Sequence, residues 1–367
     1  MTIIKPQSTI GIIGGGQLGR MSALAAAALG LRVHIYSDHE DSPAAHVSNS
    51  VTVAAFDDIE ALKRFASSVD VVTFEFENIP DESIKAIESV AEVRPGSNVL
   101  KASRNRVREK DFLNNIGVKT APYKKIESFA DLQNGVSEIG PKCILKTAEL
   151  GYDGKGQYRI NPETQLDEIW SQVQGQDTVL EGMVDFEKEI SVIIARGKDG
   201  VDLPFYPSEN IHKNGILDVT IAPARIEDEI VDKAWNIARS VVSSLDLVGI
   251  LAVEMFLMKN GDLLVNEIAP RPHNSGHWTM DACITSQFEQ FIRAVCGMPL
   301  GSAEHQCRSV MKNLIGSDID LWDKYVAQPS TKIHLYGKKV VKEGRKMGHV
   351  THLLLSDDDI LEDIIDQ

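Results

Sequence analysis

The stretch that decides the central fold reads Ile250-Leu-Ala-Val-Glu-Met-Phe-Leu-Met-Lys-Asn-Gly-Asp-Leu-Leu-Val-Asn-Glu267. An Asn-Gly pair between two apolar runs is the strongest short-range indication of a β-hairpin. If Asn260 and Gly261 form the turn, counting back along both strands places Glu254 directly opposite Glu267. We therefore expect their Cβ atoms about 4.5–5.5 Å apart on one face of the hairpin.

Two carboxylates at this separation repel each other unless a cation lies between them. Mg²⁺ is the simplest such cation, because it is a hard ion that takes oxygen ligands and often arrives with nucleotide phosphates. The alternatives are that one carboxyl group is protonated, or that the register slips and the two never meet. The pair Glu254 and Glu267 thus predicts a magnesium site, with both alternatives open.

The bulk composition narrows the class of protein. A chain of 367 residues is long enough for two or three domains, and its net charge of -15 argues against general binding to nucleic acid or to an anionic membrane. Its four cysteines lack the C-x-x-C spacing of metal sites and favour reduced core thiols. There is no signal-peptide core and no apolar run of about 18 residues. We expect a cytoplasmic protein without nucleic-acid or membrane partners.

Strands and helices alternate near the N-terminus. Strands are expected at 9–14, 31–36, 50–54 and 69–75, with helices at 17–29 and 58–67. This alternation predicts a parallel sheet with helices on both faces.

The pattern changes farther along the chain. A basic helix is expected at 103–116, and helices at 228–245 and 286–296 flank the hairpin. A small α+β lid is expected from strands at 143–147, 178–181 and 189–195 with a polar helix at 163–174. A small β-rich cap is expected from strands near 309–315, 332–336 and 349–355.

A glycine run, Gly14-Gly-Gly-Gln-Leu-Gly19, follows the first strand and precedes the first helix. It fits the G-x-G-x-x-G pattern, and Asp38 lies where a ribose-binding carboxylate is expected, which is typical of a dinucleotide site. The glycines equally suit another phosphate or ribose near a helix N-terminus, or a turn that only packs. The residues alone leave these three interpretations open.

A second glycine run, Gly151-Tyr-Asp-Gly-Lys-Gly-Gln157, comes after the strand that carries Lys146. Glycines let backbone N–H groups close around phosphate oxygens, and Lys155 adds positive charge. The run lacks the Lys-Ser/Thr ending of a P-loop, so it predicts a different kind of phosphate site. A flexible hairpin tip is the alternative.

The segment Glu181-Gly-Met-Val184 follows an apolar strand, and Glu189 begins the next strand. Backbone groups at an exposed strand edge commonly bind adenine, and a nearby carboxylate can accept hydrogen bonds from ribose hydroxyls. A solvated acidic turn would show the same pattern.

The segment after the hairpin reads Asn266-Glu-Ile-Ala-Pro-Arg-Pro-His-Asn-Ser-Gly-His277. Its two prolines stiffen the backbone that presents Arg271, His273 and Asn274, and an arginine can hold a planar anion in bidentate fashion. This segment predicts an anionic co-substrate beside the γ-phosphate of ATP. A structural loop with a buried arginine is the alternative.

Basic residues gather near the C-terminus of this acidic chain. Such a local reversal of charge predicts a phosphate-bearing substrate, with a solvated basic hairpin as the alternative. The cluster consists of Lys338, Lys339, Lys342, Arg345 and Lys346.

Taken in order, these motifs resemble the ATP-grasp superfamily over almost the whole chain. They are most similar to the family of N5-carboxyaminoimidazole ribonucleotide synthetases, ATP- and bicarbonate-dependent enzymes of purine biosynthesis. The resemblance rests on Gly14–Gly19, Phe74-Glu-Phe-Glu-Asn78, Gly151–Gln157, Asn266–Gly276, Tyr336-Gly-Lys338 and Arg345-Lys-Met-Gly-His349.

The resemblance implies an α/β fold of ATP-grasp architecture. An N-terminal doubly wound, Rossmann-like parallel-sheet domain is expected over 1–102. An ATP-grasp α+β domain over 103–297 is expected to include an α+β lid at 115–185, and a small C-terminal β-rich cap to occupy 298–367.

The resemblance also implies that ATP lies between the lid and the hairpin, with Mg²⁺ on Glu254 and Glu267. Many ATP-grasp enzymes carry an Asn two residues after the second Glu, where this chain has Ala269. Strand alternation turns Asn266 to the other face unless the strand breaks there. The residues expected to bind ATP are Arg106, Lys146, Gly151, Tyr152, Asp153, Gly154, Lys155, Gly156, Gln157, Glu181, Gly182, Met183, Val184, Glu189, His212, Asn266 and Glu267.

The implied reaction converts bicarbonate and ATP to carboxyphosphate, which then carboxylates the amine of 5-aminoimidazole ribonucleotide. The products are ADP, phosphate and N5-carboxyaminoimidazole ribonucleotide, on the route to IMP. Arg271, His273 and Asn274 are expected to hold the carboxyphosphate or its CO₂, and Tyr152 or Asp153 to orient the amine or move its proton. The residues expected to bind the ribonucleotide are Gly16, Gln17, Leu18, Glu75, Asn78, Lys338 and Arg345.

Other functions remain as alternatives at this point. The nearest is the formate-dependent glycinamide ribonucleotide transformylase, which has a similar Pro-Arg-Pro-His segment. An NAD-dependent oxidoreductase built on Gly14–Gly19 is a remote alternative, since it leaves the pair Glu254 and Glu267 unexplained. A nucleotide-binding regulator without turnover is a third. The resemblance further implies a homodimer.

Overall fold

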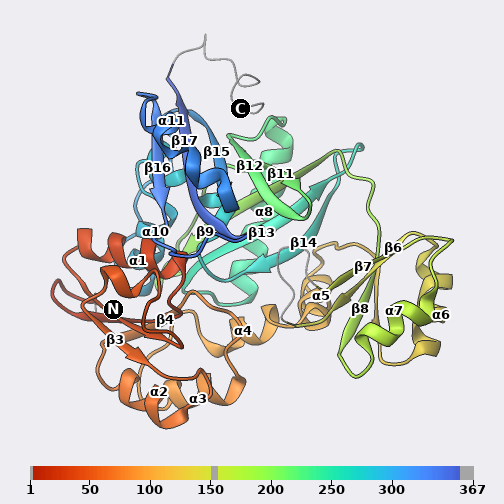
Figure 1. Ribbon diagram of the computed structural model, residues 1–367, viewed down its shortest axis with the longest axis horizontal. Helices are drawn as coiled ribbons and strands as arrows, with labels where there is room; N and C mark the ends of the chain where they lie inside the picture. Colours follow the sequence, from red (N-terminus) through yellow and green to blue (C-terminus); the bar gives the residue numbers. More distant parts are fainter. Residues whose placement is uncertain (1–2, 150–155, 356–367) are drawn as a thin grey trace.

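Three β-sheets and the helices packed on them form the part of the chain that the computed structural model describes, residues 3–149 and 156–355. In Figure 1 the N-terminal sheet lies at the lower left, a second four-stranded sheet lies at the right, and a long sheet lies between and above them.

The N-terminal sheet is parallel, with the strand order β3-β2-β1-β4. The predicted alternation of strands and helices is confirmed here, and β4 is buried along its whole length, as expected for a strand covered on both faces. The elements are β1 (Thr9–Ile13), α1 (Gln17–Ala28), β2 (Arg32–Ser37), a 3-10 turn η1 (Ala45–Val47), β3 (Ser50–Val53), α2 (Ile59–Ala66), β4 (Val71–Phe74) and α3 (Asp81–Glu88).

The second sheet, which we call the lid sheet, is antiparallel with the order β5-β8-β6-β7. Its helices pack on it through one small core that includes Leu132, Leu145 and Val173. Strands β6 and β8 were predicted, whereas β5, β7 and α6 were not. The strand expected in the lid at 189–195 is present but belongs to the long sheet, where it pairs with β11 and β13. The elements are β5 (Tyr123–Ile126), α6 (Phe129–Ile139), β6 (Cys143–Thr147), β7 (Gln157–Ile160), α7 (Leu166–Val173) and β8 (Thr178–Gly182).

The long sheet has nine strands in the order β14-β13-β9-β11-β12-β15-β17-β16, with β10 paired to β9. The predicted C-terminal strands are present, and they continue this sheet because β15 pairs with β12. Strands β10 to β12 were not predicted. The strands are β9 (Lys188–Arg196), β10 (Asp202–Pro204), β11 (Ser208–Lys213), β12 (Ile216–Ala222), β13 (Gly249–Leu257), β14 (Leu263–Ala269), β15 (Arg308–Ile315), β16 (Thr331–Leu335) and β17 (Lys346–Leu354).

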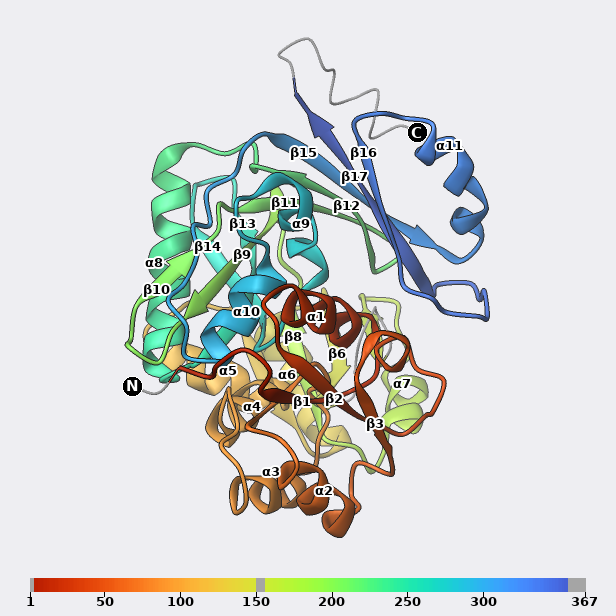
Figure 2. The same cartoon turned by 90° about the vertical axis from the view of Figure 1, so that its left-hand side faces the viewer.

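Strands β9 and β13 are buried on both faces. Val192 and Val253 pack toward α8 in one core, whereas Ile193 and Ala252 face a second core formed with α1 and α10. Figure 2 shows α1 beside α10, where the N-terminal unit meets the long sheet. The remaining helices are α4 (Ser97–Ser103), α5 (Arg106–Asn115), α8 (Asp228–Ser244), η2 (Asn274–Gly276), α9 (Thr279–Ala282), α10 (Gln287–Val295), η3 (Gly316–Leu321) and α11 (Trp322–Val326).

Among the helices described here, none combines the length and the apolar character that a membrane crossing requires.

The basic helix expected at 103–116 is present as α5, which begins three residues later than expected, and a separate helix, α4, precedes it. Helix α4 ends at Ser103 and α5 begins at Arg106. The break follows from Asn105, whose side-chain oxygen accepts hydrogen bonds from the backbone N–H groups of Val107 and Arg108 and so caps α5. This cap starts α5 at Arg106, whose side chain reaches β14.

An ion pair stabilises the junction between the N-terminal unit and the long sheet. The guanidinium of Arg94, almost fully buried, donates to both carboxylate oxygens of Glu92 and to the carbonyl of Val295. Lys198 contacts the same carboxylate at 2.9 Å. These cations lower the pKa of Glu92 to about 2.

Glu92→Gln is expected to lower the free energy of unfolding at pH 7 by about 0.5–1 kcal/mol, because the half-exposed carboxylate is partly screened by solvent. The pKa of Glu92 in the folded protein lies below its ordinary value of 4.5. Its contribution is therefore complete above about pH 4.5 and is lost as the pH falls toward 2. Urea unfolding of the unaltered and Glu92→Gln proteins across this pH range measures the contribution of Glu92 to the free energy of unfolding. A difference in stability that does not change with pH would contradict this prediction.

Candidate active site

The hairpin places Glu254 opposite Glu267, as predicted, although by a different route. The loop is longer than two residues, since Leu257 pairs with Leu263, one residue out of the expected register. A β-bulge between Glu254 and Met255 then restores the pairing, because β14 carries one extra residue at that point. The strands are thus paired one residue out of register near the loop. The bulge restores the expected register at Glu254 and Glu267, so the two carboxylates still lie opposite each other.

The extra residue is Asn266. Both Asn266 and Glu267 line a cavity of 890 Å³ between the long sheet, the lid sheet and the N-terminal unit. Simple strand alternation would have separated these neighbours onto opposite faces. The bulge is the break in alternation that brings both of them to the cavity.

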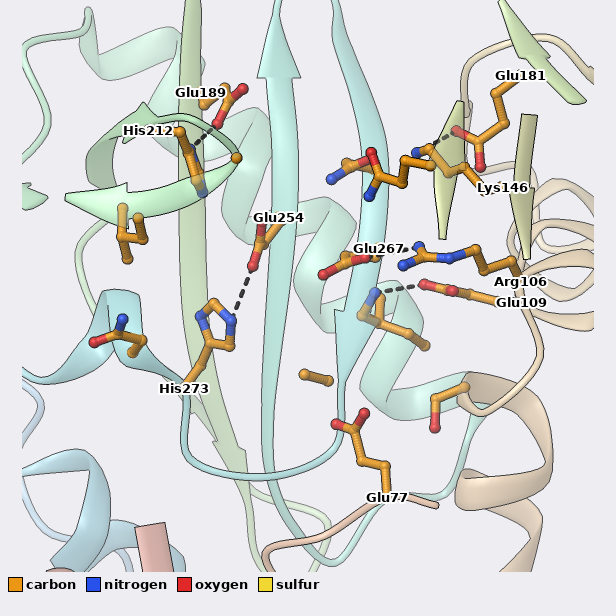
Figure 3. Close-up of a pocket in the computed structure, with 18 of the residues that line it drawn as sticks. Glu77, Arg106, Glu109, Lys146, Glu181, Glu189, His212, Glu254, Glu267 and His273 are labelled. Carbon is orange, nitrogen blue, oxygen red and sulfur yellow. Dashed lines mark hydrogen bonds and ion pairs between the residues drawn. The ribbon is translucent and has the colours of Figure 1, made fainter. Parts of the chain in front are cut away.

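Each carboxylate of the pair already contacts a side chain of the protein (Figure 3). Glu267 accepts from Arg106 at 2.9 Å, and Glu254 contacts Nε2 of His273 at 2.9 Å. Burial alone would raise the pKa of Glu267, but the neighbouring guanidinium of Arg106 lowers it to about 2. Glu267 is therefore ionised across the physiological range.

The donor set suits magnesium. The described residues contain no group of three or more His, Cys, Asp or Glu side chains that could enclose a metal. Glu254 and Glu267 offer hard oxygen donors at one wall of the cavity, with Asn266 beside them. Mg²⁺ characteristically binds through one or two carboxylates and completes its shell with water and substrate phosphates.

A buried charged cluster forms the wall between α5 and the lid sheet. Nζ of Lys146 lies 2.9 Å from Glu181, and Nζ of Lys110 lies 3.4 Å from the same carboxylate oxygen. Burial lowers the pKa of Lys146 more than Glu181 raises it. The pKa of Glu181 is lowered because the two lysines outweigh the effect of its burial. This wall can present cationic groups to phosphate oxygens in a dry environment.

Next to this wall, beyond the end of β8, the cavity has a less polar slot. Gly182, Met183 and Val184 line it, and Phe186 stacks on Phe256 with the ring centroids 4.7 Å apart. The aromatic pair provides an apolar surface suited to a planar base.

Glu189 and His212 form an ion pair beside that slot, between β9 and β11. Burial would lower the pKa of His212, but its contact with Glu189 outweighs burial and raises it. The sequence predicted both residues near the nucleotide, and both line the cavity.

The segment after β14 brings Arg271, His273 and Asn274, the residues predicted to hold a small anion, to the cavity. Nε of Arg271 lies 2.8 Å from Glu77, whose pKa is raised because burial outweighs the nearby cations. The amide oxygen and nitrogen of Asn274 are buried and have no hydrogen-bond partner among the described residues. This part of the cavity therefore retains polar groups for a small ligand.

The first glycine run surrounds a carboxylate. The N–H of Gly16 donates to Glu75 at 2.6 Å, and a Cβ on Gly14 would lie 2.7 Å from the same oxygen. Burial raises the pKa of Glu75. Asp38, the residue expected for a dinucleotide ribose, has a side chain that is 52% exposed and contacts His39. The glycines make room for Glu75, which itself lines the cavity.

The other predicted ribonucleotide contacts are divided. Gln17, Leu18 and Asn78 line the cavity with Glu75. Lys338 and Arg345 do not line it. Lys338 donates to the carbonyl of Lys346, and Arg345 donates to the carbonyl of Val340. Lys346 lines the cavity in their place, so their predicted contact with substrate phosphate stays a prediction.

The second glycine run is described only in part. Gly151, Tyr152, Asp153, Gly154 and Lys155 lie outside the described residues. Gln157 lines the cavity at the start of β7, and Gly156 has a left-handed φ of 70° that favours glycine.

Sequence reasoning gave no individual role to Glu77, Glu109 or Lys110. Glu77 and Glu109 line the cavity, and Lys110 lies in the wall between α5 and the lid sheet. Glu109 is 3% exposed, and burial raises its pKa to about 8. Lys110 is 2% exposed. The available signal was their spacing of three and four residues from Arg106, which places all three on one helix face.

Comparisons with known proteins agree with this geometry. Three family models match, in chain order: a ribonucleotide synthetase preATP-grasp domain (residues 7–104), an ATP-grasp domain (111–288) and a phosphoribosylaminoimidazole carboxylase C-terminal domain (309–363).

Curated relatives extend the match over nearly the whole chain. The N5-carboxyaminoimidazole ribonucleotide synthase of Brucella melitensis biotype 1 is 46% identical and covers 96% of this chain and 98% of its own length. The bifunctional purine synthesis protein purC/E of Dictyostelium discoideum is 43% identical over 95% of this chain, which spans only 37% of that longer protein.

Solved structures give the same result. An ADP complex of N5-carboxyaminoimidazole ribonucleotide synthetase has a TM-score of 0.95 and 42% identity, covering 100% of this chain and 97% of its own. The Aspergillus clavatus synthase in complex with ADP and 5-aminoimidazole ribonucleotide has a TM-score of 0.89 and 30% identity, covering 95% and 94%. The expected family and ATP-grasp fold are confirmed, and the chain belongs to the N5-carboxyaminoimidazole ribonucleotide synthase family of ATP-dependent ligases.

Proposed function

We propose that the cavity joins ATP, bicarbonate and 5-aminoimidazole ribonucleotide to form N5-carboxyaminoimidazole ribonucleotide, ADP and phosphate. One observation carries the proposal. A carboxylate pair, a buried cationic wall and the segment with Arg271 and His273 all line a single cavity. This combination suits a phosphoryl transfer from a nucleotide to a small anion.

ATP would lie with its base in the slot beside Phe186 and its phosphates toward Lys146 and Arg106. The buried position of Lys146 supports this, because a cation in a dry wall interacts strongly with phosphate charge. Glu189 would accept and His212 would donate hydrogen bonds at the ribose, and their contact with each other beside the slot supports this.

Mg²⁺ would be held by Glu254 and Glu267. When bound, it supplies charge neutralisation at the phosphate oxygens. Occupation of this site would relieve the repulsion between two carboxylates whose present partners are Arg106 and His273.

Bicarbonate would be oriented by Arg271, His273 and the amide of Asn274. An oxygen of bicarbonate attacks the γ-phosphorus, the bond to the β-phosphate oxygen breaks, and ADP leaves with carboxyphosphate formed. The role of Arg271 is to hold the planar anion in line with the phosphate through parallel N–H donors. Its present partner Glu77 would exchange for this anion or lie beside it.

The ribonucleotide would enter over the carboxyl ends of β1 and β4, where Gln17, Glu75 and Asn78 line the cavity. Its amine attacks the carboxyl carbon of carboxyphosphate, phosphate leaves, and one proton is lost from the nitrogen. Tyr152 or Asp153 would orient that amine or accept its proton, and Lys338, Arg345 and Lys346 would neutralise the substrate phosphate. The family resemblance supports a homodimer in the cytoplasm.

The test is an ADP-release assay in which each co-substrate is omitted in turn. We expect turnover to require ATP, bicarbonate and 5-aminoimidazole ribonucleotide together with Mg²⁺. Release of ADP that needs formate and glycinamide ribonucleotide and ignores bicarbonate would assign the chain to the transformylase reaction instead.

A further inference from the structure

Strand β14 departs from regular pairing at the point where it meets the cavity. It lies at the edge of the long sheet, and its only named neighbour in the strand order is β13. Met255 pairs with Val265 and Glu254 with Glu267, so Asn266 has no partner across the ladder. A bulge on an edge strand leaves backbone N–H and C=O groups that the sheet cannot satisfy.

Two side chains of α5 bond to backbone groups at this bulge. The N–H of Ile268 donates to Oε1 of Glu109 at 2.5 Å. Nζ of Lys110 donates to the carbonyl of Asn266 at 3.3 Å. These contacts bracket Glu267, one residue before it and one residue after it.

Helix geometry explains why these two residues act with Arg106. Positions 106, 109 and 110 are spaced by three and four residues, so they share the face of α5 that is packed on β14. Arg106 bonds the side chain of Glu267, while Glu109 and Lys110 bond the backbone on either side of it. One helix face thereby holds both the side chain and the main chain of the residue expected to bind the metal.

The burial of both groups indicates that they are not incidental surface charges. Glu109 and Lys110 are 3% and 2% exposed, and an ionisable side chain is rarely this buried unless specific partners compensate for its lost hydration. Lys110 also lies 3.4 Å from Glu181 on β8. It therefore connects the bulge to the lid sheet.

We propose that Glu109 and Lys110 are positioning residues that fix the bulge at Asn266 and so aim Glu267 and Asn266 into the nucleotide cavity. Without the bulge, the one-residue register shift near the loop would persist to Glu254, and it would turn one of the two carboxylates away. The inference rests on the proposed function for the identity of the nucleotide and metal. It does not depend on which co-substrate is carboxylated.

The test compares three substitutions at Glu109 by calorimetric titration with ADP, in the presence and in the absence of Mg²⁺. Gln keeps an acceptor oxygen at the same distance but cannot ionise. Asp keeps an ionisable carboxyl group but withdraws the acceptor by one methylene, and Leu removes the acceptor. Lys110→Met removes the second contact, and circular dichroism reports folding.

We expect Glu109→Gln to bind ADP with Mg²⁺ within about 3-fold of the unaltered protein. Glu109→Asp and Glu109→Leu are expected to weaken this binding at least about 10-fold, while binding of ADP without Mg²⁺ changes little. Lys110→Met is expected to weaken the binding of ADP with Mg²⁺ by a smaller factor, and to leave the binding of ADP without Mg²⁺ nearly unchanged.

A Gln variant as impaired as the Asp variant would show that an acceptor oxygen at this distance is not sufficient, and it would overturn the proposal. Unchanged Mg²⁺-dependent binding in folded Asp and Lys110→Met variants would overturn it as well. Because this readout uses ADP and Mg²⁺ alone, a failed carboxylation assay would not affect it.

Discussion

Glu267→Gln is expected to reduce ATP turnover by about 100-fold or more while the fold persists. The substitution keeps the size of the side chain but removes the charge that Arg106 and the proposed Mg²⁺ share. Gln can still accept the hydrogen bond from Arg106, so the hairpin should keep its register. The loss would be measured as the rate of ADP release at saturating co-substrates, alongside a thermal melt.

A matched control is Asp262→Asn, which removes one negative charge from the same hairpin. The Asp262 side chain is 55% exposed and lies in the loop beyond the paired residues. The Asp262→Asn protein should therefore keep full turnover. Normal turnover in a folded Glu267→Gln protein would remove Glu267 from the metal site.

Arg271→Gln is expected to lower kcat/KM for bicarbonate by about 100-fold, with a much smaller change in the KM for ATP. The guanidinium can hold a planar anion through two parallel N–H bonds, and glutamine cannot reproduce this geometry. The partly buried position of Arg271 beside Glu77 makes its charge effective at short range. Initial rates at varied bicarbonate and at varied ATP separate the two effects.

Arg239→Gln serves as the control, because Nε of Arg239 likewise contacts a carboxylate, that of Asp202, but away from the cavity. Both KM values should remain unchanged in that protein. If Arg271→Gln raised the KM for ATP as much as that for bicarbonate, Arg271 would belong to the nucleotide site instead.

The hairpin shows how far the sequence could predict the site. Apolar runs around Asn260 and Gly261 were sufficient to predict two paired strands and the meeting of Glu254 with Glu267. The longer loop and the bulge were not predictable, because their two shifts cancel and leave the same final pairing. The pairing of Leu257 with Leu263 and the position of Asn266 at the cavity show that the same pairing was reached differently.

The periodic parts of the fold were predicted well. Alternating strands and helices in the N-terminal unit and the helix at 228–245 have strong local patterns, and each is confirmed within one or two residues. Strands β10 to β12 were missed although they pair largely with their sequence neighbours, β10 with β9 and β11 with β12. The turn between β11 and β12 is Asn214-Gly215, with positive φ at both residues, so the sequence did carry a hairpin signal there that was overlooked.

The wall formed by α5 was missed for a different reason. Glu109 and Lys110 read as ordinary solvated charges on a polar helix, because charged residues are rarely buried. Only the fold brings them against β14 and Glu181. For the basic cluster near the C-terminus the difficulty was different. Its charge was evident from the sequence, but the sequence did not show which members line the cavity. Lys346 does, whereas Lys338 and Arg345 do not.

The most direct measurement follows the oxygen of bicarbonate. With bicarbonate labelled with ¹⁸O and ¹³C, a complete reaction with ATP, Mg²⁺ and 5-aminoimidazole ribonucleotide is analysed by mass spectrometry and ³¹P NMR. If bicarbonate attacks the γ-phosphorus, one ¹⁸O appears in the released phosphate and ¹³C appears in the ribonucleotide product. Phosphate without ¹⁸O, formed while ADP accumulates, would contradict the account, because it would show that bicarbonate never attacked the phosphorus.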